Sequence, residues 1–232
     1  MCIKNLRQSG IKPEGGAVKI KKPLFPIIMI ISGIIAGFLI SSAIYAFTGF
    51  SVFSSVKSNT ESANDTANAD ITMLAYKVLE SVRDGDFYAL SRIVHPEYGV
   101  VLSPCATINL TTDRHFSAEQ IATLDTDTTD YIWGIYNESG EPIVLTPLEY
   151  INEFIPAANH IEAPVIGINQ IIKSGNALEN ITDVFPNVQF VDFHISEGES
   201  SEEIDWSSLR LGFEKYNNSL RLIAIVYSRW TV

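Results

Sequence analysis

A run of 24 residues without a single charged side chain, Leu24 to Phe47, constrains this chain more than any other feature. At about 1.5 Å per residue, a helix of that length crosses a hydrocarbon core of roughly 30 Å. The sequence therefore predicts a transmembrane helix over residues 24–47. This helix separates a short basic tail, residues 1–23, from a long C-terminal part.

Basic residues are concentrated in the tail. Six Lys or Arg precede the apolar run against one acid, Glu14, and the first basic residue after the run is Lys57. Because Lys and Arg near a span stay in the cytoplasm, we expect a single-pass protein of the cell membrane, with its N-terminus cytoplasmic and its C-terminal domain outside. A cleavable signal peptide is the alternative, but its apolar region is about 7–15 residues long and ends at a small-x-small site. The best such site here, Ser41-Ser42-Ala43, lies inside the run, which favours an uncleaved anchor.

Three small residues, Gly33, Gly37 and Ser41, recur every four positions within the predicted span. This spacing places them on one helix face, where a second helix can approach closely. They are therefore candidates for transmembrane packing in a homodimer. The alternative is that small residues are common in membrane helices whatever their role.

The C-terminal part is strongly acidic. The chain has 16 Lys and Arg and 27 Asp and Glu, of which 10 basic and 26 acidic residues follow the tail. Such a surface repels nucleic acid and anionic lipid headgroups, so we expect no nucleic-acid role. The partners that remain are the lipid bilayer around the anchor, a second copy of the chain, and a membrane or cell-wall protein.

Composition divides the C-terminal part into a linker and a domain. Residues 48–69 are rich in Ser, Thr, Asn and Ala and lack an apolar period, which predicts a flexible linker. Residues 70–232 suit one folded domain. Apolar spacing over residues 71–82 predicts a helix with Asp70 as its N-cap and Gly85 as its end. A second short helix is expected from Asp86, ending before Pro96.

The last quarter of the chain is typical of β-strands. Residues 188–195 and 209–213 alternate between two faces, Asn217-Asn218 favours a hairpin turn, and residues 220–227 form an apolar strand. The acidic run from Glu197 to Asp205 is expected to be a solvated loop between two strands. The middle predicts a strand near Val100, a short helix after Ser117, a strand over 131–136 and a helix from Pro147. Helices followed by a mainly antiparallel sheet indicate the α+β class.

Several stretches resemble known proteins. The opening VLESVRDGDFYALSRIVHPEYGV (78–100) resembles the start of a nuclear transport factor 2-like domain, also called the cystatin-like cone. Other stretches resemble a family of bacterial exported and surface-anchored proteins of unestablished activity: HPEYGVVLSP (95–104), YIWGIYNESGEPIVLTPLEY (131–150), FPNVQFVDFH (185–194), DWSSLRLGFEKYN (205–217) and RWTV (229–232). The resemblance covers nearly all of residues 70–232. It implies a cone-like domain in which helices pack on a curved, mainly antiparallel sheet.

A pocket in such a cone would lie between the helices and the concave sheet. Six polar residues are candidates for ligand binding: His95, Tyr98, Asp192, His194, Arg210 and Glu214. If the two strands that carry the last four are neighbours, these four share a sheet face and could bind an anion or move a proton. The alternative is a solvent-facing salt-bridge patch on the outer side of the sheet, or an interface. We favour that alternative, because apolar residues of both strands already supply the core on the opposite face.

No metal or cofactor site is predicted. No two His residues have the spacing of a zinc site, and Asp125, Asp127 and Asp130 do not fit the calcium-loop template. The chain also lacks a Gly-rich phosphate loop and a nucleophile elbow.

The sequence therefore favours a non-enzymatic binding or assembly module anchored at the outer face of a membrane. Two alternatives stay open. One is a small-ligand sensor or enzyme that uses the interior of the cone. The other is a subunit of a conjugation- or secretion-type membrane assembly, which is suggested by the topology alone.

Overall fold

The computed structural model describes residues 53–136, 139–196 and 206–230. Residues 67–230 of that set belong to one compact unit, and residues 53–66 belong to a second. In these ranges no helix combines the length and apolar character that crossing a bilayer requires. The predicted span, residues 24–47, and the acidic run, residues 197–205, lie outside the described residues.

Helix α2 runs from Phe53 to Arg83, and its last three turns supply the predicted apolar face. Ile71, Ala75, Val78 and Leu79 are all buried in the core, as their i, i+3, i+4 spacing predicts. Gly85 follows with a φ of +68°, the left-handed conformation that ends a helix at little cost for glycine. This end of the helix is therefore confirmed.

The structure differs from the sequence prediction at the start of α2. Residues 53–69, predicted to be a flexible linker, are helical, so Asp70 is not an N-cap. This stretch contains no Pro or Gly, so nothing in its composition breaks the helix, and residues 64–70 are all exposed. The first buried residue is Ile71. From residue 64 onward, burial thus begins at Ile71, inside the helix rather than at its start.

Helix α3, Phe87–Ile93, is short and capped as expected. The Asp86 carboxylate accepts a hydrogen bond from the Ala89 amide at 2.8 Å, and Phe87 and Leu90 are buried. The remaining helices are α4 (Ala118–Ala122), the 3₁₀ helix η1 (Leu124–Thr126), α5 (Pro147–Phe154), α6 (Ala157–His160) and α7 (Ile181–Val184). Strands β3 (Tyr131–Ile135) and β4 (Pro142–Leu145) form a separate two-stranded sheet.

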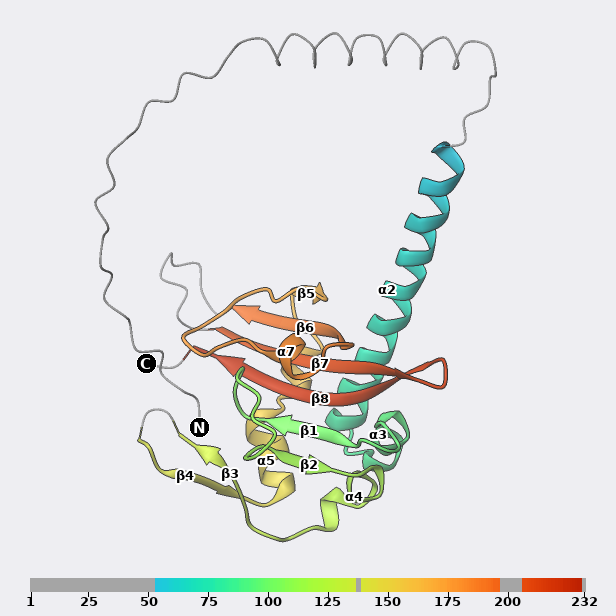
Figure 1. Ribbon diagram of the computed structural model, residues 1–232. Helices are drawn as coiled ribbons and strands as arrows, with labels where there is room; N and C mark the ends of the chain where they lie inside the picture. The colour runs from blue at the N-terminus through green and yellow to red at the C-terminus, as the bar shows by residue number, and fades with distance from the viewer. Residues whose placement is uncertain (1–52, 137–138, 197–205, 231–232) are drawn as a thin grey trace, which may run out of the picture. The chain divides into compact units, whose positions relative to one another are not determined.

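A curved six-stranded sheet in the order β2-β1-β8-β7-β6-β5 forms the centre of the domain (Figure 1). Its strands are β1 (Val100–Ser103), β2 (Arg114–Phe116), β5 (Val165–Ile168), β6 (Gln189–Ser196), β7 (Trp206–Tyr216) and β8 (Ser219–Arg229). All neighbours are antiparallel except β1 and β8, which run parallel. The turn between β7 and β8 is Asn217-Asn218, both with positive φ, as the predicted hairpin requires. The α+β class is therefore confirmed.

Both faces of the sheet are covered. On one face α2, α3 and α5 pack against Val191, Phe193, Leu209 and Leu211 in a single apolar cluster. On the other face residues 169–188, here called the covering segment, lie across the sheet and include α7 (Figure 1). Ile181 and Phe185 of this segment pack on Phe190, Ala224 and Val226. The polar side chains of β6 and β7 that alternate with the core residues therefore lie beneath a layer of chain.

Candidate functional site

Asp192 and Arg210 face each other across neighbouring strands. They are directly paired in the β6–β7 register, and their side chains are 0 % and 1 % exposed. The Arg210 Nε lies 3.2 Å from Asp192 Oδ2, close enough for an ion pair although the geometry is not that of a hydrogen bond. The sequence prediction that these residues share a sheet face is thus met. The predicted solvent-facing patch is wrong, because the covering segment buries both side chains.

The covering segment supplies the third member of this cluster. Glu179 forms an ion pair with Arg210 Nη1, while Arg210 Nη2 donates to the Lys173 carbonyl at 3.2 Å. Asp192 Oδ2 accepts the backbone N–H of Ile172 at 2.9 Å. The buried side chains of Arg210 and Asp192 thereby hold the covering segment in place, although it has no regular structure between Asn169 and Asn180. The cluster holds the domain together rather than presenting an open site.

Two carboxylates share one guanidinium in this cluster. Within it Glu179 Oε1 and Asp192 Oδ1 are buried without a hydrogen-bond partner. Burial raises the pKa of the Glu179 carboxyl and Arg210 opposes that rise, with burial the larger effect. Because the Arg210 donors point at groups of the covering segment and at Asp192, an external anion reaches Arg210 only if that segment moves.

His194 lies on the same sheet face as Asp192 and is also buried. Its Nδ1 lies 2.9 Å from the Ser208 hydroxyl, and its ring lies 5.7 Å from that of Trp206.

His160, which carries no sequence pattern, is also buried. Its Nδ1 is 3.1 Å from the Pro156 carbonyl, which only accepts, so Nδ1 carries a proton. Burial lowers the pKa of His160, which favours the neutral ring. The Nε2 atom of the neutral ring then accepts a hydrogen bond from the Ser207 hydroxyl at 3.3 Å.

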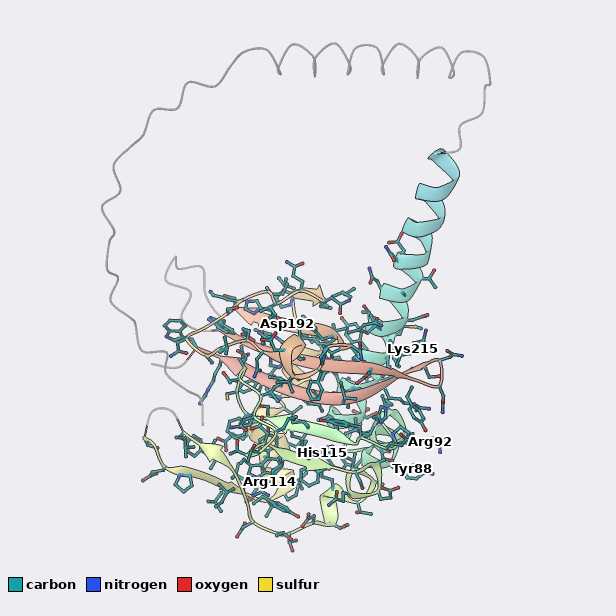
Figure 2. The ribbon with its side chains drawn as sticks, in the orientation of Figure 1. Tyr88, Arg92, Arg114, His115, Asp192 and Lys215 are labelled. Carbon is teal, nitrogen blue, oxygen red and sulfur yellow. The ribbon has the colours of Figure 1, made fainter. Side chains whose placement is uncertain are left out.

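His95 and Tyr98 lie elsewhere. The His95 backbone N–H donates to the carbonyl of Leu222 on β8. Arg210 pairs with Val226, four residues further along the same strand. At about 3.3 Å per residue, Leu222 and Val226 are roughly 13 Å apart. The His95 Nδ1 accepts the Tyr98 backbone N–H at 2.9 Å, so its role is to fix the turn before β1. Figure 2 shows Asp192 and His115 in different parts of the sheet.

Aromatic rings gather around this turn. Tyr216 lies 4.8 Å from His95, and His115 lies 4.9 Å from Tyr98 between ring centroids. Partial burial raises the pKa of Tyr98, and the nearby Glu214 adds to the rise. Glu214 itself follows a bulge after Gly212 and accepts a long hydrogen bond from Asn187 at 3.4 Å. The structure therefore separates the six candidates into a buried group on β6 and β7 and a surface group near β1.

Aromatic side chains fill the space between the helices and the sheet. Trp133 stacks on Tyr150 with ring centroids 3.7 Å apart, and Tyr150 stacks on Phe154 at 5.1 Å. Trp133 and Tyr150 are fully buried, and the Trp133 indole donates to the Leu145 carbonyl at 2.9 Å. Burial raises the pKa of Tyr150 well above its ordinary value. Both rings belong to the same cluster as the concave-face residues Phe193 and Phe213.

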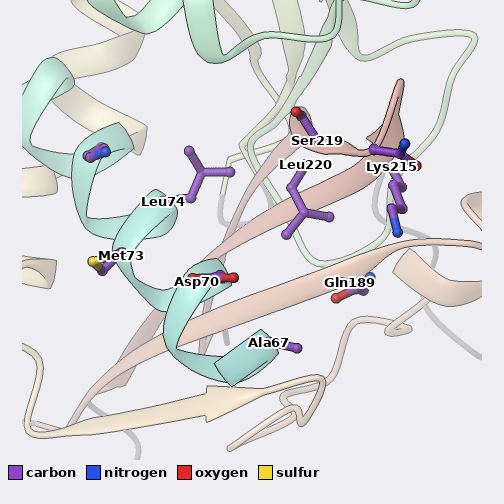
Figure 3. A pocket seen from close by; sticks show the side chains of 10 residues that line it. Ala67, Asp70, Met73, Leu74, Gln189, Lys215, Ser219 and Leu220 are labelled. Atoms are coloured by element: carbon purple, nitrogen blue, oxygen red, sulfur yellow. The ribbon is translucent and has the colours of Figure 1, made fainter. Parts of the chain in front are cut away.

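An open groove lies between α2 and the β7–β8 hairpin (Figure 3). Its volume is about 430 Å³, within the range of ordinary ligand sites. Figure 3 shows Leu74 and Leu220 projecting toward each other from the two walls. The groove, called the α2–hairpin groove below, is lined by Ala67, Asp70, Met73, Leu74, Lys77, Gln189, Lys215, Asn218, Ser219 and Leu220.

Three charged side chains line this groove. Asp70, Lys77 and Lys215 are exposed and take part in none of the ion pairs formed among the described residues. Gln189, Asn218 and Ser219 add uncharged donors and acceptors. A second hollow of about 440 Å³ lies between α2 and α3, and Lys77 borders both. Within the described ranges no three His, Cys, Asp or Glu are grouped to hold a metal ion.

The fold and these sites define an α+β domain with a fastened covering segment and an open, charged groove. No protein-family model matches the sequence, and no curated protein matches it. Two solved structures are similar at low identity. One is an NTF2-like protein of unknown function from Pseudomonas putida KT2440, with 11% identity, a TM-score of 0.29, and 71% of this chain and 87% of that chain covered. The other bears NTF2 in its name and carries five substitutions, with 13% identity, a TM-score of 0.28, and coverage of 72% and 99%.

Proposed function

We propose that this chain is a non-enzymatic binding or assembly module held at a membrane by residues 24–47. Its N-terminus lies in the cytoplasm and residues 70–232 lie outside. The uncharged run and the excess of basic residues before it support this topology. The resemblance of residues 70–232 to bacterial exported and surface-anchored proteins with a cone-like domain agrees with it.

One observation carries the binding role: the buried polar groups serve the domain's own structure, whereas the charged groups of the α2–hairpin groove do not. Arg210 forms ion pairs with Asp192 and Glu179. Lys77 and Lys215 are exposed at an open groove and form no ion pair among the described residues. Binding requires such available groups, whereas a catalyst needs titratable groups positioned around a shielded substrate.

The aromatic filling of the interior supports this choice over a small-ligand sensor. Trp133, Tyr150 and Phe154 occupy the space between helix and sheet where such a ligand would bind. A subunit of a conjugation- or secretion-type assembly is a special case of the binding role, supported by topology alone.

The test is a cross-linking pull-down of the full-length protein from intact host cells. The control chain keeps the anchor and the segment up to residue 69 and lacks residues 70–232. We expect a defined set of membrane or wall proteins with the full chain and not with the control. A charge-reversed groove, Lys77→Glu with Lys215→Glu, should lose that set, while Arg92→Glu on α3 should keep it. Identical recovery with full chain and control would refute the binding role.

A further inference from the structure

The α2–hairpin groove is a basic spot on an acidic domain. Lys77 and Lys215 place two ammonium groups along it, against the single carboxylate of Asp70. The part of the chain after the tail counts 10 basic and 26 acidic residues, so a groove lined by two lysines and one carboxylate has a charge opposite to that of the domain as a whole. Leu74 and Leu220 add an apolar floor between the charged groups (Figure 3). A complementary ligand is anionic, carries an apolar side chain, and has donors for Asp70.

We propose that this groove binds the acidic segment 197–205 of a second copy of this chain. The segment has the sequence EGESSEEID. Its five carboxylates complement Lys77 and Lys215, and Ile204 complements the apolar floor. Backbone amides and the hydroxyls of Ser200 and Ser201 provide donors for Asp70. The inference rests on the binding role proposed above and names its partner as the chain itself.

The length of the segment directs it to another copy. Residues 197–205 connect Ser196 to Trp206, which pair with each other at one end of β6 and β7. Ten residue steps span at most roughly 35 Å, so a loop that leaves and returns reaches roughly 17 Å from its ends. Lys215 lies nine residues along β7 from Trp206, roughly 30 Å away at about 3.3 Å per residue. The segment therefore falls short of the groove of its own domain.

The composition of the groove favours a peptide over a lipid headgroup or free phosphate. The groove carries the Asp70 carboxylate as well as its two lysines, which disfavours a free phosphate, and the acidic domain repels an anionic membrane. A peptide offers N–H groups to Asp70 and carboxylates to the lysines together. Exposed ion pairs are individually weak and salt-sensitive, so the free chains should associate weakly. Anchoring in one membrane raises their effective concentration and makes weak association sufficient.

A charge swap tests this pairing. Two pools of the full-length chain in neutral detergent micelles, labelled with donor and acceptor dyes, are titrated against each other at 50 and 300 mM NaCl. One variant reverses the groove, Lys77→Glu with Lys215→Glu. The other reverses the segment, Glu202→Lys with Glu203→Lys. Each variant alone should self-associate at least tenfold more weakly than the original chain. The two variants mixed together should regain association to within about threefold, because each reversed surface then meets its opposite charge.

The controls are Arg92→Glu on α3 and Glu162→Lys after α6, exposed charges outside the groove and the segment. Both should associate like the original chain. Thermal unfolding of every variant establishes that it is folded, and the anchor is the same throughout, so anchor pairing does not distinguish them. A synthetic peptide of residues 196–206 should dissociate the pairs.

Three results would overturn the inference: no rescue in the mixed pair, equal losses in the controls, or groove-dependent binding to phosphatidylglycerol vesicles in place of self-association. A chain that stays monomeric here while its groove-dependent capture of another protein persists in cells would refute only this inference. A chain that associates with itself and captures nothing else would refute the broader membrane-partner role and leave the self-pairing standing.

Discussion

Arg210 and Glu179 meet across a gap of 31 residues, and the ion pair joins the middle strand β7 to a segment without regular structure. Because Arg210 also contacts Asp192, removing the guanidinium leaves two buried carboxylates without a counter-charge. We expect Arg210→Met to lower the free energy of unfolding by about 3 kcal/mol or more. Urea denaturation measures this. Arg92→Met, at an exposed position, should change it by less than about 0.5 kcal/mol. A loss in Arg210→Met no larger than in this control would contradict the structural role.

The pKa of Glu179 predicts how stability depends on pH. A carboxyl whose pKa is higher in the folded than in the unfolded chain binds more protons when folded. Its contribution to stability is therefore greatest at low pH and is lost as the pH rises above 4.5, the ordinary value, through the raised folded pKa. Glu179→Gln should remove this part of the pH dependence. The measurement is the free energy of unfolding of both chains between pH 4 and pH 8. Parallel profiles for the two would show that Glu179 titrates normally.

Tyr150 offers a test of the filled interior. Its hydroxyl is buried without a hydrogen-bond partner among the described residues, while its ring stacks on Trp133. Removing an unsatisfied buried hydroxyl and keeping the ring should leave stability unchanged or raise it by about 1 kcal/mol. Tyr150→Phe therefore should not destabilise the domain, whereas Trp133→Ala should cost about 3–5 kcal/mol through the cavity that it leaves. A loss above about 1 kcal/mol in Tyr150→Phe would mean that the hydroxyl has a partner.

Gly99 and Gly140 form a matched pair of glycines with positive φ, +78° and +73°. A Cβ on Gly99 would lie 2.3 Å from the Phe116 carbonyl oxygen, whereas a Cβ on Gly140 would meet nothing within 4 Å. Gly140→Ala should cost about 1 kcal/mol from backbone strain alone. Gly99→Ala should cost more, because β1 and β2 must separate to admit the methyl group. Equal losses in thermal unfolding would show that the strands adjust freely.

The sequence predicted the regular elements well, because periodicity fixes which residues point to the same side. The period of two on β6 and β7 placed Asp192 and Arg210 on one face before any coordinates, and the apolar spacing of residues 71–82 located the buried face of α2. Glu214 did not join them, since it lies four residues beyond Arg210, near the end of β7.

The covering segment could not be predicted in the same way. Residues 169–180 have no period, so nothing in their order indicates that they lie on the outer face of the sheet and bury Asp192 and Arg210. Glu179 was missed for that reason. The burial of His160 was missed because this residue ends a short helix that has no pattern of its own. The helical character of residues 53–69 was missed because polar composition and the lack of an apolar period do not by themselves exclude a helix.

The position of β8 has a consequence for how the domain is made. This strand is the last of the described strands in sequence order, yet it lies inside the sheet between β1 and β7, and its parallel partner β1 precedes it by more than a hundred residues. Without β8, strands β1 and β7 would each have an open edge, because only this strand joins the two parts of the sheet. Truncation of the chain before β8 should therefore divide the sheet in two rather than trim its edge.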